Sequence, residues 1–427
     1  MSLCQIHNVA FGGEGVGRID NFVLFIPFTL PGELIEASIG ERKKNFAHGT
    51  LLKILEKSPD RVAPPCSYFS HCGGCQLQHA SYPLQLEIKR RFIEDSLLRI
   101  GKITFPVPPV TPSSIPLGYR RHISLKIVPL KGSLKLGFTA VDGHSFTPVS
   151  SCLLLSSIED PILLQLESAL SIFNSELFPP KSTLKIIRNS PYKYIAAFSF
   201  SKSLPENELT EFRKKLESLD LLEGFILKSP EALLEWGVCQ PSFSYKNMVF
   251  LYSPFGFVQN HSEQSAKIYD WISEVNKDSQ KVLDLYSGIG VSSLTLAKEV
   301  KEVIGVELNS ISTELAKINA KNNQIDQVQF FCASAEDSTH KIIQSMNPDT
   351  IIVNPPKAGI DQEVLRSICL SSACRLTYIS CSPPSLARDL ALLLKEGFEI
   401  QELQCFDMFP QTTHVEIAVQ MIRIRFD

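Results

Sequence analysis

The sequence has no long hydrophobic run and no excess of positive charge. Nothing in its 427 residues approaches the roughly 18 consecutive apolar residues of a membrane-spanning helix. The polar start, Met-Ser-Leu-Cys-Gln-Ile-His, is also unlike a signal peptide. We therefore expect a cytoplasmic protein with no membrane partner. The formal charge of −3 does not indicate a nucleic-acid-binding protein, although a local basic surface can still supply phosphate contacts.

Internal repeats and low-complexity tracts are also absent. At about 150 residues per domain the chain is long enough for several domains, each with a well-buried core. One segment, residues 111–141, has basic residues and no acidic one. Its basic residues are Arg120, Arg121, Lys126, Lys131 and Lys135. Such a segment is either a phosphate-binding surface or an ordinary solvated face.

The eleven cysteines are an odd number, and without a secretion signal they favour thiols or metal ligands over disulfides. Cys66, Cys72 and Cys75 lie in a loop bounded by Pro and Gly, with five and then two residues between them. This is a compact metal-ligand spacing. Three thiolates cannot close a site, so the isolated Cys152 is our candidate for the fourth ligand. Four cysteines suit a [4Fe–4S] cluster or zinc. His71 is a further possible zinc ligand, but it lies directly beside Cys72.

Residues 4–57 contain short β-like runs, such as 22–26 and 34–38, between Gly-rich turns. This pattern predicts a five-stranded barrel of the kind that holds single-stranded nucleic acid, in a domain spanning residues 1–58. The following domain, residues 59–252, has a mixed α+β pattern. It contains an amphipathic helix over 83–100 and alternating strands after His122.

From residue 282 the pattern becomes regular, because β-like segments alternate with stretches of helical length. The segments are 281–285, 303–307, 328–332, 349–353 and 375–380. This alternation predicts a doubly wound parallel sheet, in a domain spanning residues 253–427. Ligands of such sheets bind at the carboxyl ends of the strands.

The first of these strands leads into a Gly-containing turn, and Glu307 ends the second strand about 20 residues later. An acid in this position accepts hydrogen bonds from both ribose hydroxyls of a nucleoside. The turn lacks the Gly-x-Gly-x-x-Gly pattern of a pyrophosphate loop, which favours S-adenosylmethionine over NAD. Asn354-Pro-Pro then forms a rigid loop beside the reacting methyl group. Methyltransferases that act on planar amino groups also use Asn-Pro-Pro, usually followed by an aromatic residue, but here Lys357 follows.

Cys381 lies between the strand 375–380 and a helix for which Ser385 is the expected cap. The positive end of that helix would favour a thiolate. His414 and Glu416 precede a final strand over 417–424 and are candidates for a general acid or base. The alternatives are that Cys381 is one more buried cysteine and that His414 and Glu416 are structural hydrogen-bonding residues.

Taken together, these motifs resemble the RNA uracil-C5 methyltransferase family over nearly the whole chain. The matching segments are 284–290, 354–359, 378–383, 407–412 and 414–416. The opening, with Gly15-Val-Gly-Arg and Leu24-Phe-Ile-Pro, resembles the family's TRAM barrel, which implies RNA binding. The fold implied is α/β: a TRAM-like barrel, a central α+β iron–sulfur domain and an S-adenosylmethionine-dependent methyltransferase domain with a seven-stranded sheet, in a monomer.

The resemblance also implies roles for individual residues. Cys381 would be the nucleophile and Glu416 the base that removes the C5 proton of uracil. The residues at cofactor-contacting positions are Gln259, Tyr286, Glu307 and Asn354. The cluster ligands of the ribosomal-RNA branch match Cys66, Cys72, Cys75 and Cys152. Since the tRNA branch commonly lacks these cysteines, the resemblance favours 23S ribosomal RNA as the substrate.

Three departures from the family pattern concern the cofactor site and its surroundings. The family usually has Asp at Asn354, Asn at Val291, and Gln-Val-Asn at Gln259-Asn260-His261. These departures concern cofactor affinity or substrate detail and leave the expected fold unchanged. Three other functions stay open. They are methylation of tRNA uracil, methylation of an exocyclic amine, and RNA binding by an iron–sulfur protein that has lost catalysis.

Overall fold

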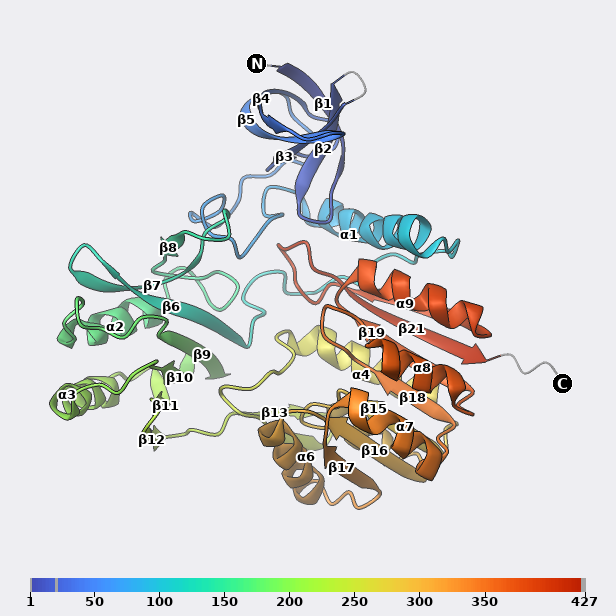
Figure 1. Ribbon diagram of the computed structural model, residues 1–427. Helices are drawn as coiled ribbons and strands as arrows, with labels where there is room; N and C mark the ends of the chain where they lie inside the picture. The colour runs from blue at the N-terminus through green and yellow to red at the C-terminus, as the bar shows by residue number, and fades with distance from the viewer. Residues whose placement is uncertain (1, 20–21, 424–427) are drawn as a thin grey trace.

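The computed structural model describes residues 2–19 and 22–423 (Figure 1). Figure 1 shows a small barrel at the top, a mixed α/β body at the left and a larger body with stacked parallel strands at the right. None of the helices in these described ranges is both long and apolar enough to cross a membrane.

The amino-terminal body is a closed five-stranded barrel with the strand order β1-β2-β3-β5-β4. Its strands are β1 (Ser2–Val9), β2 (Glu14–Ile19), β3 (Phe22–Pro27), β4 (Leu34–Arg42) and β5 (Phe46–Glu56). Glycine is required in β2 because a Cβ at Gly15 would lie 1.9 Å from Thr29 Oγ1 and one at Gly17 would lie 2.2 Å from Cys4 Sγ. The five-stranded barrel predicted from the sequence is confirmed.

The central body is built on a seven-stranded sheet with the order β12-β11-β10-β9-β6-β7-β8. The strands are β6 (His122–Leu130), β7 (Ser133–Thr139), β8 (Phe146–Pro148), β9 (Thr183–Ser190), β10 (Lys193–Ser199), β11 (Leu222–Lys228) and β12 (Leu233–Gly237). The helices packed with it are α2 (Ile162–Ala169) and α3 (Glu206–Glu217). The helix expected over 83–100 is α1 (Tyr82–Ser96), which continues into a π-helical turn, Leu97–Gly101.

A second seven-stranded sheet forms the carboxyl-terminal body, with the order β17-β16-β15-β18-β19-β21-β20. Its strands are β15 (Lys281–Leu285), β16 (Glu302–Glu307), β17 (Val328–Cys332), β18 (Thr350–Val353), β19 (Arg375–Ser380), β20 (Phe398–Phe406) and β21 (Glu416–Arg423). Strands β15 to β19 are parallel, and only the pairings of β21 are antiparallel. The five strands expected from the alternating pattern are confirmed within one residue. Ile424, expected at the end of the last strand, lies outside the described residues.

Helices connect the strands of this sheet, and a short hairpin precedes them. The helices are α4 (Ser262–Asn276), α5 (Val291–Leu296), α6 (Ser310–Asn322), α7 (Ala335–Met346), α8 (Gln362–Leu370) and α9 (Pro383–Lys395), and the hairpin is β13 (Ser242–Tyr245) with β14 (Met248–Leu251). The strand order reverses between β15 and β18, so their carboxyl ends form a crevice in which ligands bind. Helix α1, although it belongs to the central part of the chain, packs against α9 (Figure 1).

Candidate active site

A cavity of about 1200 Å³ lies at the carboxyl ends of the parallel strands. Every residue that the sequence analysis assigned to catalysis or to the cofactor lines it. These residues are Gln259, Tyr286, Glu307, Asn354, Cys381, His414 and Glu416. The cavity therefore brings together side chains from positions more than a hundred residues apart in the chain.

The turn after β15 forms one wall of this cavity. Its backbone has positive φ at Tyr286 (63°), Gly288 (56°) and Gly290 (85°), which lets the chain curl around the end of the strand. Gly290 also has no room for a side chain, since a Cβ there would lie 2.7 Å from the ring of Phe330. The amide of Gly288 donates a 3.0 Å hydrogen bond to Glu307 Oε2. The Glu307 carboxylate is thus held at the cavity wall with lone pairs left for a ligand.

The loop 354–360 forms the opposite wall and is fastened to α9. Ser385 Oγ donates to the carbonyl of Lys357 (2.6 Å), and the amide of Ile360 donates to Asp389 Oδ2 (2.8 Å). The expectation that Ser385 caps α9 was wrong, because the helix begins at Pro383 with Ser382 as its N-cap residue. Proline has no amide hydrogen to leave unbonded, so it fits the first turn of a helix.

Cys381 and Glu416 lie at the same edge of the sheet. Ser380 of β19 and Ile417 of β21 form the last pair of an antiparallel ladder, and Cys381 directly follows Ser380 while Glu416 directly precedes Ile417. The charge of Glu416 acts on the Cys381 thiol, which places the two side chains near each other. The pair was predicted from sequence motifs alone, and the structure places both members in one cavity.

The electrostatics of the Cys381–Glu416 pair differ from the expectation for the thiol. Burial raises the pKa of Cys381 to about 11, and the charge of Glu416 adds to this rise. The helix end that was expected to favour a thiolate is therefore outweighed by the burial of Cys381. Burial also raises the pKa of Glu416 to about 8, which suits a group that must take up a proton near neutral pH.

His414 lies in the same cavity beside Phe409, with 5.8 Å between the ring centroids. Burial lowers the pKa of His414 to about 4, so the imidazole is neutral at physiological pH. Sequence reasoning missed Phe409, which carries no titratable group. It also considered Arg120 only as part of a basic segment, whereas the structure places this side chain in the cavity wall.

The basic segment 111–141 is not one continuous charged surface. Arg121 is buried, with its guanidinium 4.2 Å from the ring centroid of Phe243 and bonded to Ser262 Oγ. Lys135 forms an ion pair with Glu167 at 2.6 Å. Some basic side chains of the segment therefore make contacts inside the protein, whereas others, such as Lys126 and Lys131, are exposed.

One of the three departures from the family pattern, at Gln259-Asn260-His261, contributes two residues to the packing between the central body and α4. The Asn260 side chain bonds both the amide and the carbonyl of His122 (2.9 and 3.0 Å). His261 is buried, stacks on Tyr119 at 4.8 Å and bonds Ser113 Oγ at 2.7 Å. These residues thus join segments of the fold, whereas Asn354 and Val291 face the cavity.

The cysteines assigned to a cluster lie in two loops of the central body. The charges of Cys152 and Cys66 both raise the pKa of Cys72, which places these thiols within electrostatic reach of one another, although burial is the larger cause. The amide of Gly74 donates to Cys72 Sγ at 3.4 Å. Within the described residues, however, no group of three or more His, Cys, Asp or Glu side chains could hold a metal ion. All eleven cysteines lie within the described residues, and there none of them forms a disulfide.

Comparison with known proteins gives matches along almost the whole chain. Residues 240–424 match the tRNA (Uracil-5-)-methyltransferase family, and residues 5–52 match the TRAM domain. An RNA methyltransferase of Protochlamydia amoebophila, named as uncharacterized, is 37% identical over 428 residues and aligns with 98% of this chain and 97% of its own length. A second, from Clostridium tetani, is 32% identical over 429 residues and aligns with 96% and 93%.

The chain belongs to the RNA uracil-5-methyltransferase family. It is an RNA methyltransferase, and its barrel is a TRAM domain, as the sequence indicated. Pyrococcus abyssi tRNA (uracil-54, C5)-methyltransferase, solved in complex with S-adenosyl-L-homocysteine, has the same fold, with a TM-score of 0.77, 24% identity and coverage of 99% of this chain and 100% of the other. The carboxyl-terminal sheet is thus the class I fold of S-adenosylmethionine-dependent methyltransferases.

Proposed function

We propose that this methyltransferase transfers a methyl group from S-adenosylmethionine to C5 of a uracil in RNA, through a covalent bond between Cys381 and C6 of the base. The observation that carries the proposal is the placement of Cys381 and Glu416 in one cavity, where each lies next to a member of the Ser380–Ile417 pair. A thiol paired with a buried carboxylate supplies the nucleophile and the base that this reaction requires.

Uracil C5 is a poor nucleophile until a group adds at C6. The Cys381 thiolate forms an S–C6 bond, and the electrons of the C5–C6 double bond move into an enolate. C5 of this enolate then attacks the methyl carbon, and the bond from that carbon to the sulfonium sulfur breaks, with a neutral thioether as the leaving group. Glu416 accepts the C5 proton, the S–C6 bond breaks, and the ring double bond re-forms with thiolate as the leaving group. The base must leave its stack for the thiolate to reach the ring.

The donor would occupy the part of the cavity between the β15 turn and the 354–360 loop. Glu307 is suited to accept hydrogen bonds from ribose hydroxyls, because Gly288 already fixes its carboxylate. The remaining contacts would come from Gln259, Tyr286 and Asn354, which line the same space. At Asn354 the amide can both donate and accept hydrogen bonds, but it brings no charge to the sulfonium.

Replacement of Cys381 by Ala tests the mechanism directly. We expect the variant to bind S-adenosylmethionine in calorimetry as wild type does, but to incorporate no methyl group into unmodified RNA. Methylation of an exocyclic amine would instead be indifferent to Cys381 and would leave the modification on nitrogen. Wild-type turnover by Cys381→Ala would therefore defeat the proposal.

We propose 23S ribosomal RNA as the substrate, with the barrel in residues 1–58 as an RNA-binding domain. The barrel contacts the segment that carries His414, since a Cβ at Gly13 would lie 3.0 Å from Thr413, the neighbour of His414. RNA held by the barrel would therefore lie close to the reacting groups. Unmodified 23S RNA and tRNA transcripts, assayed side by side and mapped by mass spectrometry, test the choice: 5-methyluridine in tRNA alone would overturn it.

We also propose that Cys66, Cys72, Cys75 and Cys152 hold a [4Fe–4S] cluster in the domain 59–252. In such a cluster each cysteine thiolate binds a different iron atom. The four cysteine sulfurs therefore surround the cluster and do not converge on a single metal ion. The mutual effect of the thiol charges and the Gly74 amide at Cys72 support this assignment. Iron and sulfide analysis after anaerobic purification tests it, with Cys152→Ser as the variant expected to lose both. Protein free of iron would overturn it.

A further inference from the structure

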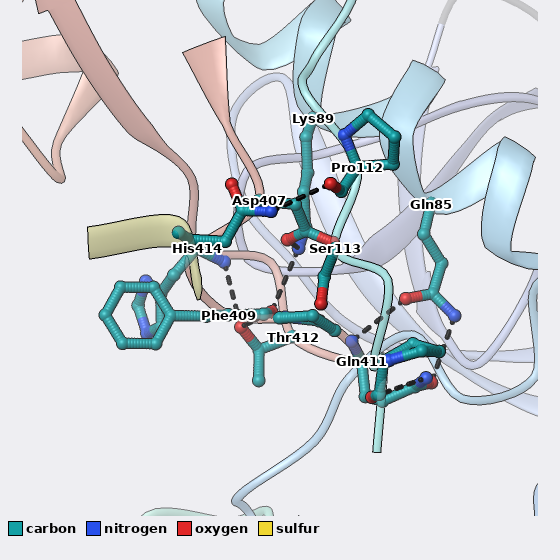
Figure 2. A network of polar contacts seen from close by, with 12 residues as sticks. Gln85, Lys89, Pro112, Ser113, Asp407, Phe409, Gln411, Thr412 and His414 are labelled. Atoms are coloured by element: carbon teal, nitrogen blue, oxygen red, sulfur yellow. Dashed lines mark hydrogen bonds and ion pairs between the residues drawn. The ribbon is translucent and has the colours of Figure 1, made fainter. Parts of the chain in front are cut away.

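Helix α1 presents polar side chains to the loop between β20 and β21, residues 407–415, which we call the 407–415 loop (Figure 2). Lys89 is fully buried, and its Nζ lies 2.5 Å from Asp407 Oδ1 and 2.9 Å from the carbonyl oxygen of Phe409. One turn earlier, Gln85 bonds Gln411 twice, through its side-chain nitrogen and its side-chain oxygen, at 3.0 Å each. The loop is thus fixed at its start and at its middle.

This loop carries groups of the cavity. Phe409 and His414 lie on it and line the cavity. Glu416, two residues after His414, also lines the cavity. The carbonyl of Phe409 accepts from both Lys89 and Thr412 Oγ1, and Thr412 Oγ1 accepts from the amide of His414 (3.2 Å). A continuous set of hydrogen bonds therefore leads from the ammonium of Lys89 to the backbone of His414 (Figure 2).

We propose that Lys89 is a positioning residue for the reaction, because its contacts with Asp407 and with the Phe409 carbonyl fix the 407–415 loop, and so the placement of Phe409, His414 and Glu416 against the incoming base. The inference rests on the proposed function, since it assigns Lys89 a role in that chemistry without contact with substrate.

The chemistry of the contact favours this role over simple stabilisation. A buried ion pair is not, in general, more stabilising than well-packed apolar residues of the same volume, because both charges lose their hydration. What the ammonium adds is directed hydrogen bonds, and here one goes to the carbonyl of a residue in the cavity wall. Asp407 is also bonded by Tyr82 Oη at 2.8 Å, so the carboxylate stays oriented toward Lys89.

Two variants separate positioning from stability. Lys89→Met leaves Asp407 as a buried charge without its partner, so we expect a lower Tm and a fall in kcat of about 10²-fold, the loss typical of an ångström-scale misplacement, with little change in KM. The double variant Lys89→Met/Asp407→Asn removes both charges and should recover most of the Tm. Its kcat should stay low, because the Phe409 carbonyl still lacks the hydrogen bond from Lys89. Recovery of kcat together with Tm would overturn the proposal.

The matched control is Ile88→Ala, on the same helix. Ile88 is buried in an apolar cluster with Val9, Leu77 and Phe92, outside the polar contacts of the loop. This variant should lower the Tm and keep kcat within about twofold of wild type. An equal loss of kcat in Ile88→Ala and Lys89→Met would mean general loosening and would also overturn the proposal.

Hydrogen exchange separates this inference from the proposed function. The amides of residues 411–414 should exchange faster in Lys89→Met and in the double variant, but not in Ile88→Ala, whatever reaction the enzyme catalyses. If the wild-type protein does not methylate uracil but the variants show this exchange pattern, the proposed function is overturned. The conclusion that Lys89 fixes the 407–415 loop would still stand. Active wild type with unchanged exchange and unchanged kcat in Lys89→Met would overturn the positioning role alone.

Discussion

Cys381 directly follows Ser380 and Glu416 directly precedes Ile417, the two members of the last pair between β19 and β21, and both side chains line the cavity. The charge of Glu416 makes ionisation of Cys381 harder, since it adds to the rise in the pKa of the thiol. An uncharged uracil ring entering between them changes this balance, because addition of the thiolate to C6 removes the negative charge from sulfur. The carboxylate can then act as a base without a neighbouring thiolate.

Replacement of Glu416 by Gln should therefore stop the reaction after methyl transfer. The amide cannot take up the C5 proton, so the S–C6 bond persists and the enzyme stays attached to its RNA. We expect turnover to fall by about 10²- to 10⁴-fold, the usual contribution of a general base. A protein–RNA adduct that survives denaturing electrophoresis is the measurement. Glu402→Gln, on the neighbouring strand β20, is the control and should release product normally.

The same substitution should change stability in a pH-dependent way. Burial raises the pKa of Glu416 from 4.5 to about 8 in the folded protein, so the folded state favours the protonated form. The stability that this proton contributes is fully present below pH 4.5 and is lost as the pH rises through 8, at about 1.4 kcal/mol per unit of pKa difference. Relative to wild type, Glu416→Gln should gain stability between pH 5 and 8, by urea denaturation. A constant difference across that range would contradict the assignment.

Lys357 has the opposite effect on the pKa of Cys381 from that of Glu416, and this can be tested. Its charge lowers the pKa of Cys381, against burial and the charge of Glu416. Lys357→Met should therefore raise the pKa of the thiol further and slow its alkylation by iodoacetamide at any fixed pH. Because Lys357 is exposed, high salt should reduce the difference between the variant and wild type. Lys395→Met, at the far end of α9, should alkylate as wild type does.

Much of this arrangement could be predicted from the sequence, because it follows from local patterns. A β-prone run followed by Ser-Pro-Pro must end a strand, and this placed Cys381 at the edge of the sheet. The ionisation of Cys381 was not predictable in the same way. A helix end contributes about 0.3–1 kcal/mol, less than one pKa unit, and the burial of the thiol outweighs it.

Lys89 shows a second limit of sequence patterns. It follows Ile88 on α1, and a lysine beside an apolar stripe normally lies at the solvent boundary of a helix. Its burial arises because a loop more than 300 residues further along the chain covers that face of α1, and no local pattern records such a contact. Arg120 was misjudged for a similar reason, since composition showed its charge but not the cavity that it faces.

Asp389 should control the geometry of the loop 354–360, which forms one wall of the cavity. It is fully buried and accepts hydrogen bonds from Tyr378 Oη (2.7 Å) and from the amide of Ile360 (2.8 Å), at the end of the loop that begins with Asn354. Asp389→Ala leaves both donors buried without a partner, so we expect a loss of about 2–4 kcal/mol in the free energy of unfolding.

The loop should also become less well ordered, and the Kd for S-adenosylmethionine measured by calorimetry should rise by at least tenfold. Asp389→Asn keeps one acceptor oxygen, so its Kd for S-adenosylmethionine should lie between those of wild type and Asp389→Ala. Cys381 supplies the comparison. Cys381→Ala removes the reacting sulfur without touching the loop anchors, and should leave the Kd near that of wild type. If Asp389→Ala lost stability but bound S-adenosylmethionine as wild type does, Asp389 would be a core residue only, and the wall would owe its shape to its paired prolines.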